Sequence, residues 1–98
     1  MNIQALMKQA QQMQKDILKA KAEIDAMVFE GESALVKVYV YGNKTVQKVE
    51  FLDQEEAKND LEMLSDMLVV AFNDAFSKID KVTEQKMGKY SNSMPGLF

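Results

Sequence analysis

The sequence contains no cysteine, histidine, arginine or tryptophan among its 98 residues, and only one proline. Without cysteine it can form no disulfide, thiolate zinc site or cysteine nucleophile. Without histidine it lacks the Ser-His-Asp triad, an imidazole acid or base and the commonest metal ligand. All twelve basic residues are lysines, which cannot clamp a phosphate or carboxylate with the two parallel hydrogen bonds of arginine. We therefore predict that the protein is not an enzyme and has no cofactor or metal.

Composition points to one small folded domain. Hydrophobic residues make up 47% of the chain and charged residues 28%, which is typical of a globular protein. No apolar run is long enough for a membrane span, and the apolar residues near the N-terminus are spaced, unlike those of a signal peptide. We expect a cytoplasmic protein that does not contact membranes.

Residues 2–27 are predicted to form a helix with a heptad pattern. Apolar residues recur every seven positions in two series offset by three, which are the a and d positions of a heptad repeat. Such a narrow seam favours contact with another helix, although an ordinary amphipathic helix packed on its own domain is the alternative. The a series is Ile3, Ala10, Ile17 and Ile24, and the d series is Leu6, Met13, Ala20 and Met27.

Residues 28–52 are predicted to form three antiparallel strands, the first of them short. Two β-branched and aromatic stretches, 34–41 and 45–52, flank the pair Gly42-Asn43, which tolerates the positive φ angles of a tight hairpin turn. Val46 and Val49 differ in parity along the last strand, and a β-bulge would account for this.

A short helical turn and then a long helix over about 60–87 are predicted to follow. Asp53 with Glu56, and Asn59 with Glu62, fit the capping box at a helix start. Gly88 is the expected C-terminal stop. The sequence thus predicts one α+β domain over 1–88 and a flexible tail over 89–98.

The long helix is apolar on several sides over residues 67–76, which predicts burial on several sides. Two helices of about 40 Å would also project beyond the compact fold of one short chain. We therefore predict a homodimer, with an interface that includes Met67, Val69, Val70, Phe72 and Phe76.

Charge is distributed unevenly along the chain. Its net value of −3 taken alone argues against a nucleic-acid partner. Residues 1–22 hold four lysines and one acid, a net charge of +3, and residues 77–98 hold four lysines and two acids, +2. Residues 53–76 hold one lysine and seven acids, −6. If the sheet joins the helices as a hairpin, both basic ends meet at one tip.

The basic ends are candidate DNA-binding surfaces. On a helix, Lys8, Lys15 and Lys19 fall within about 40° of one another, opposite the apolar seam. Lysine contacts to phosphate bind nucleic acid without reading its sequence. The candidate residues are Lys8, Gln11, Gln12, Lys15 and Lys19 in the first helix and Lys78, Lys81 and Lys89 at the other end.

The acidic stretch 53–66 could be taken for a metal site. It lacks the glycine and the ordered Asp/Asn spacing of a calcium loop. Acids in a first helical turn stabilise the helix dipole, which is the reading we favour. The acids concerned are Asp53, Glu55, Glu56, Asp60, Glu62 and Asp66.

Four segments, in order, resemble the YbaB/EbfC family of bacterial nucleoid-associated proteins. The segment LMKQAQQMQ is similar to the family's N-terminal helix, and EGESALVKV with the later YGNK is similar to its sheet. The segment LVVAFNDA is similar to its most recognisable helical stretch, and MPGLF is similar to its usual tail. They occupy Leu6–Gln14, Glu30–Val38 with Tyr41–Lys44, Leu68–Ala75 and Met94–Phe98.

The resemblance implies an α-β-β-β-α protomer and a homodimer with protruding helices. It further implies binding of double-stranded DNA by basic helical residues, a role in nucleoid organisation and gene expression, and a link to recombination or replication proteins. This chain departs from many relatives in using lysine alone and in having Tyr90–Ser93 where the tail is often rich in glycine. Because arginine on guanine is the commonest base-specific contact, we expect weak sequence preference.

Two other functions fit the same pattern. Heptad-bearing helices on a sheet also resemble the plan of prefoldin-type chaperones, and eight methionines suit an adaptable binding surface. Alternatively, the acidic stretch 53–66 could dock recombination proteins, which would make the protein an adaptor.

Overall fold

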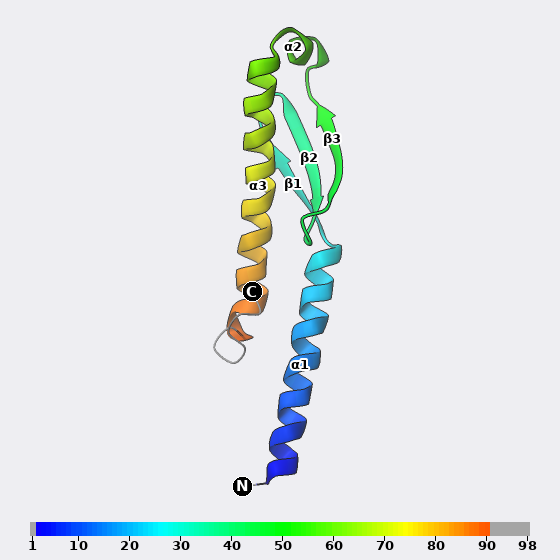
Figure 1. Ribbon diagram of the computed structural model, residues 1–98, viewed down its shortest axis with the longest axis vertical. Helices are drawn as coiled ribbons and strands as arrows, with labels where there is room; N and C mark the ends of the chain where they lie inside the picture. Colours follow the sequence, from blue (N-terminus) through cyan, green and yellow to red (C-terminus); the bar gives the residue numbers. More distant parts are fainter. Residues whose placement is uncertain (1, 91–98) are drawn as a thin grey trace.

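The computed structural model describes residues 2–90 and confirms the α+β class with an α-β-β-β-α order (Figure 1). The molecule measures 70 Å along its longest axis and only 19 and 15 Å across. The helices are α1 (Ile3–Ala26), α2 (Gln54–Asn59) and α3 (Leu61–Met87), followed by the 3₁₀ turn η1 (Gly88–Tyr90). The strands are β1 (Val28–Glu32), β2 (Val36–Tyr41) and β3 (Val46–Phe51).

The strands form one antiparallel sheet in the order β1-β2-β3, and α3 lies along one of its faces (Figure 1). The central strand β2 alternates between buried and half-buried residues, as expected when one face of a sheet is covered. The core forms where this strand meets the helix. Its fully buried residues include Val36, Val38 and Val40 of β2 and Ala71, Ala75 and Ile79 of α3.

The predicted β-bulge is present in β3. Tyr39 pairs with Lys48, but the next residue, Val40, pairs with Val46, so Gln47 is the extra residue. The bulge explains the parity of the strand, because it returns Val46 to the same sheet face as Val49. That face is the one on which α3 lies.

The predicted two-residue turn at Gly42-Asn43 is wrong. The connection has three residues, Gly42 to Lys44, and the positive φ angle, 69°, belongs to Lys44. This is the three-residue hairpin loop in which a β-turn is followed by a left-handed residue. Asn43 stabilises the loop through its side chain, because its Oδ1 atom accepts a hydrogen bond from the Thr45 N–H at 2.9 Å.

One predicted helix cap is confirmed and another shifts by one residue. The Asp53 side chain accepts the Glu56 N–H at 3.0 Å and starts α2. The predicted cap at Asn59 is wrong: Asn59 ends α2, and Asp60 caps α3 by accepting the Met63 N–H at 2.9 Å. At the other end α3 stops at Met87 as predicted, but Gly88 is right-handed and leads into η1 instead of adopting a left-handed stop.

Helix α1 reaches far beyond the other described elements (Figure 1). Ile17 and Ile24 are buried against Met87, with Tyr90 packed beside them, so α3 runs antiparallel to α1 and ends half-way along it. Residues 3–16 are all exposed. The expectation that the two helix ends meet at one tip is therefore wrong, because α3 uses most of its length to cover the sheet. Residues 91–98 of the predicted tail lie outside the described residues.

Two glycines allow backbone segments to approach closely. A Cβ atom on Gly31 of β1 would overlap the Ala71 carbonyl oxygen and Ala75 of α3. A Cβ atom on Gly42 would overlap the carbonyl group of Ile24, in the last turn of α1. One contact seats α3 on the sheet, and the other fixes the base of α1 against the β2–β3 turn.

A polar clamp joins α3 to β1 beside the first of these contacts. Asp74 Oδ2 accepts the Glu32 N–H at 3.1 Å and lies 3.3 Å from Lys78 Nζ, which donates to the Glu30 carbonyl at 2.8 Å. The bond from the Glu32 N–H, aided by the Lys78 ammonium group, holds the pKa of Asp74 below its usual value.

The close contact at Gly31 predicts that a larger side chain at this position lowers the stability of the fold. We expect Gly31→Ala to lower the free energy of unfolding by about 1–3 kcal/mol, because α3 must move away from β1. Gly88→Ala is the matched control, since a Cβ atom there meets nothing within 4 Å and the residue is already right-handed. Urea denaturation measures both, and equal stability of the two variants would contradict the close packing.

The Asp74 clamp makes a pH prediction. The pKa of Asp74 is lower in the folded protein than in the unfolded chain, where it is about 3.9. The clamp therefore stabilises the fold fully above pH values near the unfolded pKa, and this stabilisation is lost as pH falls towards the folded pKa. We expect Asp74→Asn to be less stable than the wild type at about pH 7, and the difference to shrink between about pH 5 and pH 2. Thermal denaturation across that range tests this, with Asp66→Asn on the same helix as the control. A difference that does not change with pH would rule out the charged clamp.

Candidate nucleic-acid interface and apolar face

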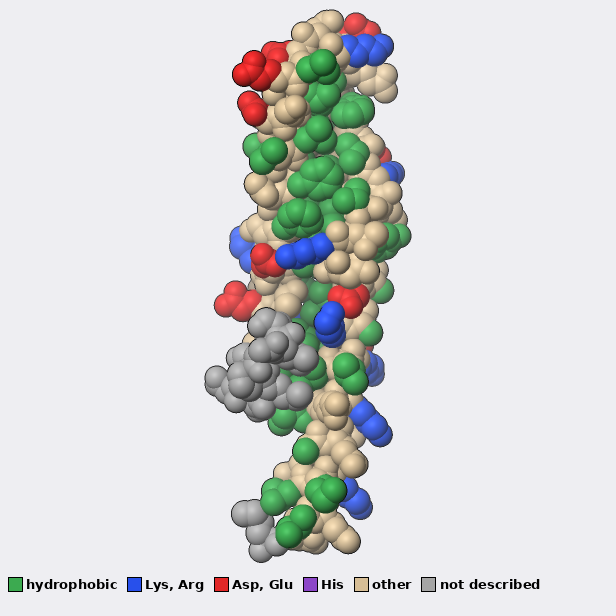
Figure 2. All heavy atoms as spheres, viewed as in Figure 1, with side chains coloured by type: hydrophobic (Ala, Val, Ile, Leu, Met, Phe, Trp, Pro, Cys, Tyr) green, Lys and Arg blue, Asp and Glu red, His purple; other side chains and the backbone are tan. Residues whose placement is uncertain are grey.

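The predicted lysine ridge begins on the projecting part of α1, with Lys8 and Lys15, and ends at Lys19, in the part of the helix that α3 covers on its other side. Lys8, Lys15 and Lys19 are exposed, and at 100° per residue they share one side of the helix, opposite the buried Ile17 and Ile24. Figure 2 shows lysine side chains along one edge of this helix. None of the three lysines has an ion pair with any residue in 2–90. The ridge is about 16 Å long and free to contact an anionic surface.

The two predicted glutamines flank this ridge. Gln11 is exposed, and Gln12 Nε2 donates to Asp16 Oδ1 at 2.9 Å. Asp16 is the only acidic residue in the first 22. Its bond to Gln12, instead of to a lysine, leaves the positive charge of the ridge unpaired.

The second predicted lysine group belongs to α3 and its end. Lys78 is bound to Asp74 and to the Glu30 carbonyl, so its charge stabilises the fold. Lys81 is exposed, and Lys89 lies with its ammonium group 5.0 Å from the centre of the Tyr90 ring. The bond from Lys78 to Glu30 could not be predicted from the sequence, because Glu30 lies 48 residues away on β1; only the pair with Asp74, four residues earlier on the same helix, is local.

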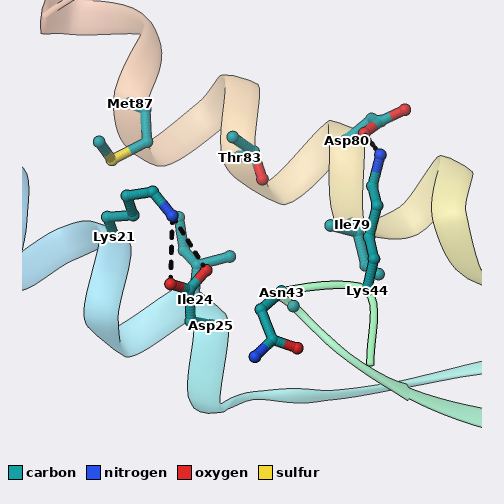
Figure 3. A pocket seen from close by; sticks show the side chains of 10 residues that line it. Lys21, Ile24, Asp25, Asn43, Lys44, Ile79, Asp80, Thr83 and Met87 are labelled. Carbon is teal, nitrogen blue, oxygen red and sulfur yellow. Dashed lines mark hydrogen bonds and ion pairs between the residues drawn. The ribbon is translucent and has the colours of Figure 1, made fainter. Parts of the chain in front are cut away.

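A cleft of about 400 Å³ lies where the base of α1 meets the β2–β3 turn and α3 (Figure 3). Two ion pairs lie on its rim, Lys21 with Asp25 at 3.2 Å and Lys44 with Asp80 at 3.7 Å. Each pair is neutral, so the cleft offers no net charge to an anion. Its apolar lining comes from Ile24, Ile79 and Met87.

An apolar face runs along one side of the molecule, between α3 and β3. Helix α3 covers β1 and β2, but the inward-facing residues of β3 remain 38–46% exposed. Figure 2 shows hydrophobic side chains gathered over this part of the molecule. We define the α3–β3 face by its residues, Val46, Val49 and Phe51 of β3 and Val69, Phe72 and Phe76 of α3.

The five predicted interface residues divide between two sides of α3. The ammonium group of Lys44, in the β2–β3 turn, lies 5.7 Å from the centre of the Phe76 ring, which places Phe76 on the β3 side. By helical angle Val69 and Phe72 share that side. Met67 and Val70 lie on the side of α3 that faces β1, the side of Asp74 and Lys78.

The α3–β3 face continues into an apolar groove of about 270 Å³ at the α2 end of the molecule. Phe51 contributes to both, and Leu61, 70% exposed, lies at the rim. The β3 residues were missed as interface candidates because the sequence does not show that α3 leaves this strand uncovered. The remaining lining residues are Gln54, Ala57, Lys58 and Leu64.

On the opposite face of the sheet, a lysine is paired with an acidic residue of the same strand. Lys48 Nζ lies 2.9 Å from Glu50 and 4.5 Å from the centre of the Tyr39 ring, and the Tyr39 hydroxyl donates to Glu50. The hydrogen bond between Lys48 and Glu50 raises the pKa of the lysine and lowers the pKa of the glutamate. This face therefore has little free positive charge for a nucleic acid.

The acidic residues of the α2 end serve as helix caps and first-turn charges. Asp53 and Asp60 cap helices, and Glu55, Glu56 and Glu62 occupy first turns. Within residues 2–90, no three acidic side chains are grouped closely enough to hold a metal ion. The same residues include no helix that is long and apolar enough to cross a membrane.

Comparison with known proteins gives matches over nearly the whole chain. Residues 1–94 match the model of the YbaB/EbfC DNA-binding family. A nucleoid-associated protein of Ligilactobacillus salivarius is 42% identical, over 99% of this chain and 95% of its own length. A nucleoid-associated protein of Streptococcus thermophilus is also 42% identical, over 97% and 98%. The crystal structure of the uncharacterized protein HP0035 from Helicobacter pylori has the same fold, with a TM-score of 0.76 at 16% identity, and covers 91% of this chain and 96% of that one.

Proposed function

Because the chain belongs to the YbaB/EbfC DNA-binding family, we propose that it is a nucleoid-associated protein that binds duplex DNA through the lysine ridge of α1. The observation that carries this proposal is the projecting half of α1. Lys8 and Lys15 on that half and Lys19 just beyond it are exposed, and no described acidic residue pairs with them. The ridge can therefore replace counterions along a DNA backbone.

The chemistry of the ridge supports weak sequence preference. Lysine is a flexible point charge that attracts phosphate oxygens, whereas arginine forms the two parallel bonds that distinguish guanine. Gln11 and Gln12 add neutral hydrogen-bonding groups beside the charges. A protein that binds in this way would occupy much of the chromosome. Such binding would place it in the nucleoid within the cytoplasm, where it would affect nucleoid organisation and gene expression.

We further propose that the functional unit is a homodimer joined through the α3–β3 face. A band of half-exposed valine and phenylalanine side chains along an otherwise charged molecule is typical of a protein interface. The charges of α1 and of the acidic end both lie outside this band. A dimer joined there would carry two lysine ridges, and the second would bind at the high effective concentration set by the first.

The dimer proposal predicts different effects for two adjacent valines. Val69 and Val70 are 59% and 48% exposed, so neither substitution disturbs the protomer core. We expect Val69→Glu to produce a monomer, because it buries a charge in the α3–β3 interface. Val70→Glu, on the other side of α3, should remain a dimer. Sedimentation equilibrium measures both masses. Dissociation by Val70→Glu alone would move the interface to the other side, and a monomeric wild type would refute the dimer.

The DNA proposal predicts loss of binding on charge reversal. We expect the triple variant Lys8→Glu, Lys15→Glu, Lys19→Glu to lose affinity for duplex DNA and to keep its mass. Six phosphate contacts in a wild-type dimer should give a slope of about −5 in log affinity against log salt. Fluorescence anisotropy at two salt concentrations measures both quantities. The control reverses the charges of Lys81, Lys86 and Lys89.

Three results would overturn this assignment. The first is binding that survives reversal of the ridge, and the second is loss of binding in the control variant only, which would move the site to the end of α3. The third is affinity that does not change with salt.

A second candidate function is an adaptor that binds recombination or replication proteins at the α2 end. The observation in its favour is the apolar groove beside Leu61, which lies among the acidic residues of α2 and the first turn of α3. Such a surface suits a basic, apolar segment of a protein. The triple lysine variant separates the two functions, because protein binding at this end should not depend on the ridge.

A further inference from the structure

The apolar seam of α1 is only half covered in the protomer. Its second half, at Ile17 and Ile24, is buried against Met87 and Tyr90. Its first half lies on the projecting part of the helix, where Ile3 is 71% exposed and Leu6 46% exposed. We call this exposed half the tip seam, formed by Ile3, Leu6, Ala10 and Met13.

The tip seam is exposed because α3 and η1 end too early to reach it. Within residues 2–90, α3 and η1 pack against α1 only as far as Tyr90, so neither of them lies beside the seam from residue 16 to the tip (Figure 1). The heptad pattern continues through both halves without interruption. Fourteen residues of isolated helix are only marginally stable in water, so the seam needs a covering helix.

We propose that a second copy of the chain covers the tip seam with its own, in antiparallel orientation. An α1 helix that enters from the opposite direction continues the line of α3. In this arrangement Ile3 of one copy meets Met13 of the other, and Leu6 meets Ala10. Each a position then faces a d position, so large and small side chains alternate across the contact.

Charge is compatible with this pairing. The positions that flank the tip seam hold Met7, Gln9 and Gln14, which carry no charge. Lys8 and Lys15 lie on the opposite side of the helix, so both ridges remain outside the contact. A pair of arms joined in this way would present lysines outward on both sides and could connect two DNA-bound molecules.

Parallel pairing of two tips fits less well. In each copy the end of α3 already occupies the seam at Ile17. Two parallel α1 helices would have both α3 ends between them at that level, which would hold their seams apart along the rest of the tip. The antiparallel arrangement avoids this, because each α1 tip stops where the other copy's α3 ends.

Site-directed disulfides test the orientation directly, since the chain has no cysteine of its own. Two variants are needed, Leu6→Cys and Ala10→Cys, one of which carries a mass tag. Disulfides form only where two Cα atoms come within about 7 Å. After mild oxidation of the mixture, we expect a cross-linked species that contains one chain of each kind. Each variant oxidised alone should remain uncross-linked.

The matched control is a mixture of Lys8→Cys and Gln12→Cys chains, which have the same spacing on the opposite side of α1. Cross-linking as efficient as in the first mixture would show random collision and overturn the proposal. A disulfide in Leu6→Cys alone would show parallel pairing, and absence of any cross-link would show that the seam is bare or covered by another part of its own chain. Either result also overturns it.

Discussion

The structure depends on the close approach of α3 to the first two strands. Gly31, Ala71 and Ala75 let helix and strand backbones come together where any larger side chain would separate them. Seated there, α3 covers β1 and β2 and cannot also cover β3, because one helix is about as wide as two strands. The α3–β3 face follows directly from this position. The same contact that forms the core therefore leaves an apolar face exposed, and residues 2–90 of one protomer do not bury their own apolar side chains completely.

Helix α1 shows the same principle at the other end of the molecule. Ile24 approaches Gly42 closely and fixes the base of the helix, while Ile17 is covered by the end of α3. Beyond that point the chain supplies nothing more within the described residues, so the helix continues alone. Projection has two consequences: it separates the lysine ridge from the acidic α2 end along a molecule 70 Å long, and it exposes the tip seam. The separation of the lysine ridge from the acidic end and the exposure of the tip seam therefore have one cause, the projection of α1 beyond the end of α3.

Much of this could be predicted from sequence because the signals are local. The heptads of α1, the cap at Asp53 and the bulge in β3 are each fixed by residues within one or two turns or across one hairpin. The errors also have local causes. Lys44 instead of glycine adopts the positive φ because the bulged hairpin needs three loop residues, and Asp60 instead of Asn59 caps α3 because α2 uses Asn59 as its last residue. The sequence does not show that the predicted interface residues lie on two different sides of α3. Their placement depends on how α3 is rotated about its own axis on the sheet, and the close contact of Gly31 with Ala71 and Ala75 sets that rotation.

The net charge of −3 is a poor guide to partners for a molecule of this shape. Charges separated by more than about 10 Å are largely screened at moderate salt, so a DNA backbone beside the projecting helix would interact with the ridge and very little with the acids of the α2 end. The acids are nevertheless useful where they lie: they cap and stabilise helix starts, and they would repel DNA from the groove beside Leu61. An elongated acidic protein can thus present a basic surface, provided that its fold keeps the two charges apart. Here the long α3, seated at Gly31 and ending against Ile17, maintains that separation.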